Sequence, residues 1–468
     1  MTYRYTIIGA GLAGLSAGYN LVKGGRSVSV LEKEEYVGGL AASFTQNGYT
    51  YDLGPHRFYT KNVKVQAQVE DMLGANVHWR DRLSRIFLLG KFFDYPLKAG
   101  NVIKSLPPHL LIQSFLDYLV IRVKNRFRPI PDDCFQNWVI KRFGKTLYRL
   151  FFGTYTEKAW GIPCTQISAD WASQRITLLN LWDTVKQTLF KPKNVPRTLV
   201  SKFVYPVTGG IGNIAREYTR RLRAEPNDMN RVVTGVTIER FRWKGDRVVA
   251  VDYVKDGKRE TEEVENLITT VPVTTAIDLF DPAPPEDVLQ ARRSLRYKAI
   301  VFVYLLLDRE KVTDDHWVYL PEQHLKVHRI SEFKNFSEHC APQGKTIVAA
   351  EITCNFEDHI WNMSKEDAIA LAASDLEKTG LIKKGEVVDG FVRREKFSYP
   401  LYDLTYRENL KKCLAWMKGL KNCYPTGRQG LFQYGNMDHS VAMGLVLAEK
   451  LLKGQSGDED VIGSEYLG

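Results

Sequence analysis

Three glycines with fixed spacing near the start of the chain could bind a phosphate group. Gly9, Gly11 and Gly14 form a G-x-G-x-x-G sequence, and the acidic residue Glu32 follows the next apolar run. Glycine in such a turn lets the backbone come close to a pyrophosphate, and the N-terminus of the following helix supplies positive potential. A carboxylate at the position of Glu32 accepts hydrogen bonds from a ribose. These residues predict that the chain binds a dinucleotide.

The elements around these glycines are those that such a turn requires. Apolar residues over 3–8 predict a buried strand, residues 12–22 predict a helix with small side chains toward a sheet, and residues 28–31 predict a second strand. Together they form one βαβ unit of a Rossmann-like sheet. The predicted fold class is therefore α/β.

The sequence after Glu32 resembles that of flavoproteins in the glutathione-reductase-like and amine-oxidase-like classes. A second glycine pair, Gly38 and Gly39, lies where the chain of those proteins passes close to FAD. Segment 231–241 resembles the strand that holds the adenine end, and segment 427–454 resembles their closing FAD motif. The resemblance implies a non-covalently bound FAD. The residues that it places against the cofactor are Gly9, Gly11, Gly14, Glu32, Gly38, Gly39, Val236, Arg428, Asn436, Met437 and Asp438.

The segments that match the flavoproteins are far apart, so the FAD-binding domain is predicted to be discontinuous. Helical periodicity and aromatic residues predict a mainly helical insertion, and alternating apolar residues predict an antiparallel β-sheet domain for the substrate. The glycine-rich, acidic end of the chain predicts a flexible tail. The predicted parts are 1–62, 201–270 and 427–454 for FAD, 63–200 for the helical insertion, 271–426 for the sheet, and 455–468 for the tail.

Several separated motifs carry a closer resemblance. They are YDLGPHRFYTKN (51–62), RLSRIFLLGKFFDYPL (82–97), FGKTLYRLFFGTYTEKAWGIPCTQISADWASQRI (143–176), RISEFKNF (329–336), FSYPLYD (397–403) and QYGNMDHS (433–440). Each is similar to a segment of the UDP-galactopyranose mutases, within the wider amine oxidase and protoporphyrinogen oxidase superfamily. Those flavoenzymes interconvert the pyranose and furanose rings of a sugar nucleotide and use reduced FAD as a nucleophile. The resemblance implies the same activity here.

The mutase resemblance assigns roles to individual residues. It implies catalytic roles for His56, Arg175 and Arg329, with the histidine beside the flavin and the two arginines on a departing nucleoside diphosphate. Cations are needed there because negative charge develops on the leaving group. The residues that it implies for substrate binding are Phe151, Tyr155, Trp160, Tyr399 and Tyr434. The six cysteines have no metal-like spacing, and no metal site is predicted.

Each of these residues also has a purely structural interpretation. Arg329 could pair with Glu332 on the surface, and Arg175 could flank a helix. Phe151 and Tyr155 have the i, i+4 spacing of a buried helical stripe, so core packing stands beside base stacking as an alternative. Trp160 precedes a glycine where a helix would end, and it could be a packing wedge.

A second function competes with the mutase reaction. Segment 203–222 departs from the mutase pattern, because its Y-P-x-x-G-G-x-G sequence resembles protoporphyrinogen oxidases and phytoene desaturases. The alternative is therefore an FAD-dependent oxidase or desaturase that acts on a large apolar substrate. Pockets for such substrates are lined mostly by apolar side chains, and two converging arginines do not fit that description. A catalytically silent FAD-binding scaffold is a further alternative, which would not need to keep the arginines and the histidine.

The charge of the chain limits its partners. The net charge of +11 favours an anionic partner, either a phosphorylated substrate or an acidic membrane surface. No nucleic-acid-binding motif accompanies the charge, so nucleic acid is not expected. The predicted partners are a nucleotide-sugar substrate and an NAD(P)H-linked reductant for the flavin, and the oligomeric state is left open.

The predicted location is the cytoplasm. The chain enters a strand almost at its first residue, which leaves no room for a signal peptide, and it has no apolar run of the length that crosses a bilayer. Segment 110–127 predicts an apolar helix with a basic end. Packing of this helix inside the helical insertion is the favoured interpretation, and peripheral contact with an acidic membrane is the alternative.

Overall fold

The chain forms two compact units. The computed structural model describes residues 4–176, 202–224 and 230–455. The first unit comprises residues 1–79, 204–296 and 406–468, and the second comprises 80–203 and 297–405. These boundaries differ from the predicted ones, most clearly at residues 406–426, which the sequence analysis assigned to the substrate domain.

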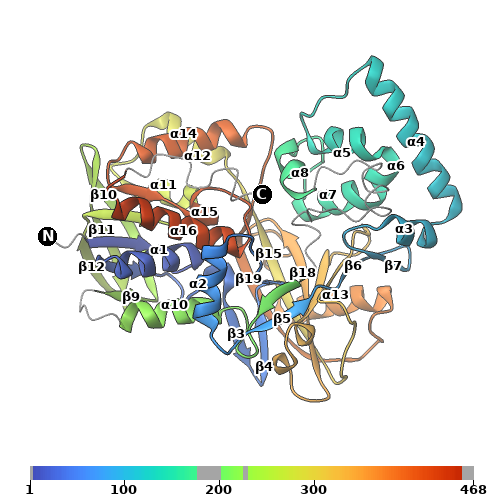
Figure 1. Cartoon of the computed structure of the whole chain (residues 1–468), viewed down its shortest axis with the longest axis horizontal. Helices are drawn as coiled ribbons and strands as arrows, with labels where there is room; N and C mark the ends of the chain where they lie inside the picture. Colours follow the sequence, from blue (N-terminus) through green and yellow to red (C-terminus); the bar gives the residue numbers. More distant parts are fainter. Residues whose placement is uncertain (1–3, 177–201, 225–229, 456–468) are drawn as a thin grey trace. The chain divides into compact units, whose positions relative to one another are not determined.

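A five-stranded parallel sheet organises the first unit (Figure 1). Its order is β20 (Cys423–Pro425), β13 (Asn266–Thr269), β1 (Arg4–Ile8), β2 (Ser27–Leu31) and β9 (Arg231–Val233). Helix α1 (Leu12–Lys23) packs against α10 (Asn213–Ala224) and α16 (Met437–Leu452). A Cβ atom at Gly18 of α1 would contact Ile7 and Val28, so small residues let this helix lie close to the sheet, as predicted.

A four-stranded sheet completes the first unit. Its order is β12 (Lys258–Glu263), β11 (Arg247–Lys255), β10 (Val236–Lys244) and β14 (Phe280–Asp281). Helix α14 (Tyr406–Lys418) packs on α12 (Glu286–Ser294), where the Cys413 thiol lies 3.9 Å from the carbonyl oxygen of Val288. This packing places residues 406–418 in the first unit.

The remaining elements of the first unit are β3 (Ser43–Gln46), β4 (Tyr49–Asp52), α2 (Val63–Leu73), α11 (Val273–Asp278), α15 (Gly427–Gly430) and a 3-10 turn at Gly39–Ala41.

A seven-stranded sheet organises the second unit. Its order is β19 (Val387–Pro400), β15 (Tyr297–Leu307), β18 (Thr346–Cys354), β17 (Arg329–Glu332), β16 (Trp317–Tyr319), β6 (Ser84–Leu88) and β7 (Lys91–Asp94). All neighbours are antiparallel except β16 and β6. Two short 3-10 turns follow β17, at Phe333–Asn335 and Glu338–Cys340, and β5 (His78–Asp81) pairs with β8 (Lys202–Tyr205).

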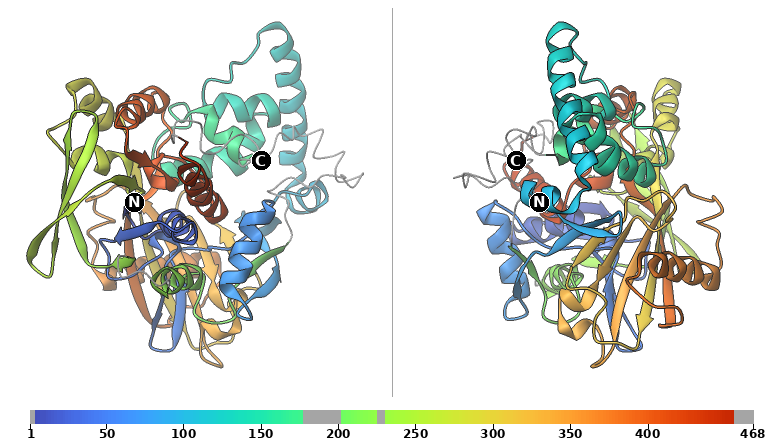
Figure 2. Two further views of the ribbon diagram at one scale, coloured as in Figure 1. Left: turned by 60° about the vertical axis from the view of Figure 1, so that its left-hand side comes forward. Right: turned by 90° about the vertical axis from the view of Figure 1, so that its right-hand side faces the viewer.

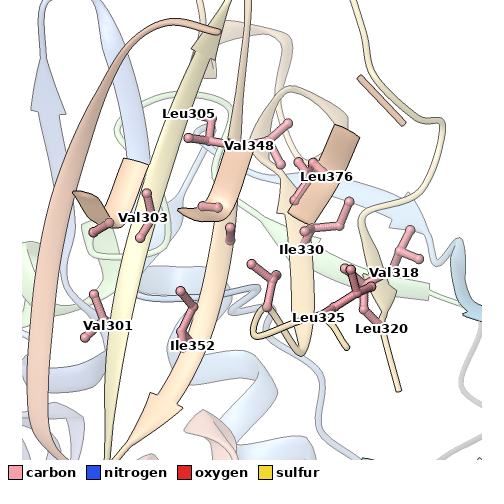
Figure 3. Packing of buried hydrophobic residues seen from close by; sticks show 14 of the residues in the cluster. Val301, Val303, Leu305, Val318, Leu320, Leu325, Ile330, Val348, Ile352 and Leu376 are labelled. Atoms are coloured by element: carbon pink, nitrogen blue, oxygen red, sulfur yellow. The ribbon is translucent and has the colours of Figure 1, made fainter. Parts of the chain in front are cut away.

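The two faces of the seven-stranded sheet differ in chemistry because side chains alternate along each strand. One face is apolar and packs against α13 (Lys365–Thr379). Figure 3 shows Val303, Val348, Ile330 and Leu376 in this layer, all buried. Burial of this apolar surface, at about 25 cal/mol per Å², anchors the sheet. The opposite face carries charged and aromatic residues, among them Arg329 and Glu351.

Apart from α13, the described helices of the second unit follow one another along the chain. They are α3 (Ala99–Ser105), α4 (Pro108–Phe127), α5 (Phe135–Phe143), α6 (Lys145–Leu147), a π-helical turn at Tyr148–Gly153, α7 (Thr154–Trp160) and α8 (Ala169–Arg175). Helix α4 begins with proline at its first position, where the missing N–H costs no helical hydrogen bond. No helix in the described ranges is both long enough and apolar enough to span a membrane.

Candidate functional site

The glycine loop between β1 and α1 is closed on two sides and open on the third. A Cβ atom at Gly9, where φ is +102°, would overlap Thr270, and a Cβ atom at Gly14 would overlap the carbonyl oxygen of Gly9. At Gly11 a Cβ atom would have no neighbour within 4 Å. Protein atoms therefore pack against the loop at Gly9 and Gly14, whereas the backbone at Gly11 is accessible. Close approach of a pyrophosphate requires such an accessible backbone.

Glu32 lies beside this loop at the end of β2. Its carboxylate accepts hydrogen bonds from the backbone N–H groups of Ala10 (2.6 Å) and Glu34 (3.0 Å). Burial raises the pKa of Glu32, and these backbone donors oppose that rise. Val236 donates its backbone N–H to the carbonyl oxygen of Glu32 at 2.8 Å. The residues predicted for the ribose and for the adenine end are thus neighbours.

The second glycine pair reaches the same loop. The Gly38 N–H donates to the carbonyl oxygen of Ala10 at 2.8 Å, and Gly38 forms an isolated β-bridge with Gly11. Gly38 and Gly39 have φ angles of 109° and 54°, which favour glycine over other residues. Residues predicted for one cofactor thus meet from distant parts of the sequence, and the cradle that they form fits the pyrophosphate and ribose of FAD.

The closing motif forms the start of α16. The Asn436 side chain caps this helix, and the Asn436 backbone N–H donates to Nδ1 of His439 at 3.2 Å. Met437 and Asp438 follow and are buried. Arg428 donates to the carbonyl oxygen of Gly435, and its guanidinium carbon lies 4.6 Å from the ring centre of Tyr434. The capped N-terminus of α16 supplies backbone donors and positive potential for a polar ligand group.

His56 lies in the loop after β4 and is half-buried. Its backbone N–H donates to the carbonyl oxygen of Gly54 at 2.7 Å, and Gly54 has a φ angle of 92°. A tight glycine turn thus sets the position of His56 in the first unit, and its role beside the flavin remains a prediction.

The segment that departs from the mutase pattern folds around a buried carboxylate. Asp52 accepts hydrogen bonds from the hydroxyls of Ser43 and Tyr205 (2.8 Å to Tyr205) and from the backbone N–H of Ile211 at 3.3 Å. A Cβ atom at Gly210 would lie 2.7 Å from Asp52 Oδ1. Packing around Asp52 therefore accounts for Tyr205 and Gly210 of the Y-P-x-x-G-G-x-G sequence, whatever the substrate is.

Asp52 should make the stability of the protein depend on pH. Burial raises the pKa of Asp52 to about 7, against an ordinary value of about 4. Between these values the folded protein keeps a proton that the unfolded chain releases, so the free energy of unfolding falls by a few kcal/mol as pH rises from about 4 to 7. Asp52→Asn removes this titration. The quantity to measure is the melting temperature of the variant minus that of the wild type. We expect this difference to increase by a few degrees between about pH 5 and pH 8. The control variant Glu263→Gln changes an exposed carboxylate, and for it we expect no such increase.

Arg329 lies on the polar face of the sheet in the second unit. The strand register places it opposite Tyr319 on β16 and opposite Glu351 on β18. Its Nε and Nη2 atoms donate to the two carboxylate oxygens of Glu351 at 2.8 and 2.6 Å, and Nη2 also donates to the Tyr399 hydroxyl at 3.3 Å. Bidentate pairs of this kind fix the plane of a guanidinium.

The alternative pairing of Arg329 with Glu332 is wrong. Residues three apart on a strand point to opposite faces. Glu332 instead accepts hydrogen bonds from the backbone N–H groups of Val312 (2.8 Å) and Thr313 (2.7 Å). Burial alone would lower the pKa of Arg329, but Glu351 outweighs it and, with nearby tyrosines, raises that pKa well above its ordinary value. Arg329 is therefore a permanent cation.

Aromatic rings surround this cation. Tyr155 of α7 contacts Tyr319 edge to face with ring centres 5.3 Å apart, and Tyr319 contacts Tyr95 at 4.8 Å. The rings of Trp160 and Tyr399 are 5.8 Å apart. We call Arg329, Glu351, Tyr399, Tyr155, Tyr319 and Trp160 the arginine–aromatic cluster. Sequence reasoning found four of these residues and missed Glu351 and Tyr319, whose only signal is alternation within apolar strands.

Two further basic residues, Arg82 and Lys158, accompany the cluster, and burial lowers the pKa of Lys158 to about 7. Arg82 donates from Nη2 to the carbonyl oxygen of Tyr95 at 3.2 Å, and burial lowers the pKa of Arg82. Lys158 donates from Nζ to three carbonyl oxygens, those of Leu320, Glu322 and Val327, at 2.8, 3.0 and 2.7 Å. Lys158 thus ties the segment just before Arg329 to α7. Neither residue was among the predicted site residues.

The other predicted site residues of the second unit lie as follows. Phe151 is buried with its ring centre 5.3 Å from that of Phe93, which is the core packing that its helical spacing allowed. Arg175 is the last residue of α8, and its side chain lies outside the described part of the structure. Among the described residues, no group of histidine, cysteine, aspartate and glutamate could hold a metal ion.

Comparison with known proteins identifies a family and a shared fold. The family model of flavin containing amine oxidoreductases matches residues 12–407. The crystal structure of reduced UDP-galactopyranose mutase is similar with a TM-score of 0.85 and 19% identity, over 100% of this chain and 97% of that one. A putative protoporphyrinogen oxidase from Exiguobacterium sp. 255-15 has a TM-score of 0.73 and 16% identity, over 97% and 100% of the chains.

Curated relatives match in short stretches. The 4,4'-diapolycopene oxygenase of Methylomonas sp is 34% identical over 125 residues, which is 25% of each chain. The L-amino-acid oxidase of Crotalus adamanteus is 42% identical over 67 residues, 14% of this chain and 13% of that one. The 4,4'-diapophytoene desaturase of Staphylococcus haemolyticus is 43% identical over 49 residues, 10% of each. The chain matches a quarter or less of the length of these relatives.

Proposed function

The chain belongs to the family of flavin containing amine oxidoreductases, and from that premise we propose that it is a sugar-nucleotide mutase. It would interconvert the pyranose and furanose forms of a UDP-galactose-like substrate, with non-covalently bound FAD in the reduced state. The arginine–aromatic cluster is the observation that carries this proposal. The fold shared with reduced UDP-galactopyranose mutase, at a TM-score of 0.85, supports it.

The cluster suits a nucleoside diphosphate for a specific reason. Glu351 engages Nε and Nη2 of Arg329, while Nη1 makes no hydrogen bond to the described part of the chain. The charges of the pair cancel, so its contribution to binding is a directed N–H donor rather than net charge. Arg82 adds a cation to the same unit, and Tyr155 and Tyr319 offer ring surfaces suited to a nucleobase.

The same residues would support the reaction. Bound, reduced FAD would supply the nucleophile that attacks the anomeric carbon of the sugar. As the bond from that carbon to the diphosphate breaks, negative charge grows on the leaving oxygen. Arg329 and the Tyr399 hydroxyl would donate hydrogen bonds to the diphosphate, and a preorganised donor stabilises such charge more than water does. Because Glu351 holds the guanidinium in place, little reorganisation would accompany this step.

A specific observation favours the oxidase or desaturase alternative. The chain has local sequence similarity to 4,4'-diapolycopene oxygenase and 4,4'-diapophytoene desaturase, enzymes named for large apolar substrates. Two residues of the Y-P-x-x-G-G-x-G sequence, Tyr205 and Gly210, no longer add to that case, because packing around Asp52 explains them. A cluster built on an arginine–carboxylate pair is also a poor lining for an apolar substrate.

The two candidate reactions differ in their need for an oxidant, because the oxidase or desaturase reaction consumes one and the mutase reaction does not. We expect anaerobic protein reduced with dithionite or NADPH to convert UDP-galactopyranose to the furanose form, measured by anion-exchange chromatography. Oxidised protein should be inactive, and the mutase reaction should consume no oxygen. Absence of conversion by the reduced protein, together with mole-for-mole oxygen uptake on an apolar polyene, would contradict the mutase proposal and support the alternative.

A further inference from the structure

Helix α4 exposes a continuous apolar stripe. Seven of its apolar side chains are between 43% and 79% exposed. They follow the i, i+3, i+4 spacing of one helical face. These residues, which we call the α4 stripe, are Ile112, Phe115, Leu116, Leu119, Val120, Val123 and Phe127. Soluble proteins rarely expose so large a contiguous apolar patch without a binding role.

The opposite face fixes the orientation of the helix. Ser114, Tyr118 and Ile121 are buried, and Asp117 accepts a hydrogen bond from the backbone N–H of Thr146 at 3.1 Å. A Cβ atom at Gly144 would lie 3.2 Å from the backbone nitrogen of Tyr118, so the two chain segments are in close contact. In Figure 1 and Figure 2 the neighbouring helices α5 and α6 lie along one side of α4. The stripe is therefore held pointing away from these helices.

Basic residues border the stripe. On a helix with 3.6 residues per turn, Arg122 and Arg126 lie along one border and Lys124 along the other, and Arg128 follows at the C-terminus. None of these four forms an ion pair with any described residue. In contrast, Lys141 and Arg142 of the adjacent helix both pair with Asp132. The stripe thus combines an apolar centre with cations that have no carboxylate partner in the described chain.

We propose that α4 docks in the plane of a membrane whose surface carries acidic lipid headgroups. Such a helix buries its apolar face at the boundary between headgroups and acyl chains, and its basic borders pair with lipid phosphates. Charge favours a bilayer over a second copy of the chain. A two-fold contact through the stripe would bring a chain with net charge +11 and unpaired arginines against an identical surface. The proposal holds for either reaction considered above.

Vesicle flotation of the flavin-loaded protein tests the proposal. We expect binding to vesicles of phosphatidylcholine with phosphatidylglycerol, weaker binding at high salt, and little binding to phosphatidylcholine alone. Leu116→Ser/Val120→Ser, in the stripe, should lower the partition coefficient about tenfold or more. Lys124→Gln/Arg126→Gln, at its borders, should lower it roughly 30-fold, because each basic residue near an anionic surface contributes about a factor of five.

Matched control variants keep the test specific. Val388→Ser/Leu404→Ser changes one valine and one leucine that are 53% and 56% exposed elsewhere in the second unit, against 48% and 54% for the stripe pair. Lys383→Gln/Lys384→Gln removes two exposed charges from that unit. Both controls should float like the wild type. Failure of the wild type to bind anionic vesicles, or equal losses in the controls, would overturn the proposal. A wild-type dimer that the stripe variant dissociates would also overturn it, by assigning the stripe to a second copy.

Discussion

Arg329→Met/Glu351→Gln should weaken UDP binding by about 10- to 100-fold while the protein keeps its FAD. The double variant removes the Nη1 donor and the fixed guanidinium, and charge-assisted hydrogen bonds contribute roughly 1.5–3 kcal/mol each. The loss in kcat/KM should be larger, about 100- to 1,000-fold, because charge on the leaving group is greatest in the transition state. Titration of the flavin spectrum with UDP measures the first quantity, and the chromatographic assay measures the second.

The paired substitution is needed because of Glu351. This carboxylate is completely buried and opposite Arg329. Arg329→Ala alone would leave it without its cation, which costs about 3–5 kcal/mol of stability and confuses binding with folding. Replacing both partners avoids the stranded charge. Arg329→Lys is a useful intermediate, since lysine keeps the charge but cannot form the bidentate pair, and we expect a smaller loss of UDP affinity.

A second arginine–carboxylate pair, between Arg85 on β6 and Asp315 just before β16, supplies the control. Arg85 donates from Nε to the buried Asp315 at 2.8 Å and from Nη2 at 2.7 Å. The register pairs Arg85 with Val318 of the apolar layer, whereas Tyr319, the next residue, lies opposite Arg329. Arg85→Met/Asp315→Asn should lower stability without changing UDP affinity. If the Arg329 double variant binds UDP as tightly as the wild type, the pair is purely structural and the proposed role of Arg329 is wrong.

The cofactor cradle could be predicted from sequence because most of its determinants are local. A strand, a glycine turn, a helix and an acid within one βαβ unit place Gly11 and Glu32 without reference to the rest of the fold. In the structure, backbone hydrogen bonds bring Gly38 to Ala10 and Val236 to Glu32, and a motif comparison cannot supply these bonds.

The arginine–aromatic cluster could be predicted only in part. Arg329 stood out because its own motif is distinctive, but its partner comes from β18, 22 residues away, and strand register decides the pairing. Glu351 lies in an apolar strand and shows no motif of its own. The segment around Glu332 offered a nearer carboxylate, and only the alternation of side chains along β17 excludes it.

The α4 helix shows a different limit. Its sequence is apolar around much of its circumference, so periodicity predicts the helix but not the side that is buried. The polar residues Ser114 and Asp117 face the neighbouring helices and loops, while Leu116 and Val123 are exposed. Hydropathy taken residue by residue favours the opposite orientation, with Leu116 and Val123 buried and with Ser114 and Asp117 exposed. Contacts with Thr146 and Gly144, which lie beyond the helix, decide the orientation.

Gly11→Val should give a folded protein that binds flavin more weakly than the wild type. At this position φ is −71° and ψ is 171°, an extended conformation that valine adopts, and a Cβ atom meets no protein atom within 4 Å. The added side chain therefore costs the unliganded protein little. It occupies the open side of the loop, where a pyrophosphate would approach the backbone, and overpacking of 1–3 kcal/mol corresponds to roughly 5- to 150-fold weaker cofactor binding. The ratio of flavin absorbance to protein absorbance in purified samples measures the loss.

Two other glycines separate a blocked cofactor site from a damaged fold. Gly14→Val would push its Cβ atom into the carbonyl oxygen of Gly9, so this variant should lose both flavin and thermal stability. Gly100→Val, at an exposed position with no neighbour within 4 Å, should keep both. Gly11→Val should resemble Gly14→Val in flavin content and Gly100→Val in the melting temperature of the flavin-free protein. A Gly11→Val protein that binds flavin as tightly as the wild type would show that the pyrophosphate does not approach this loop.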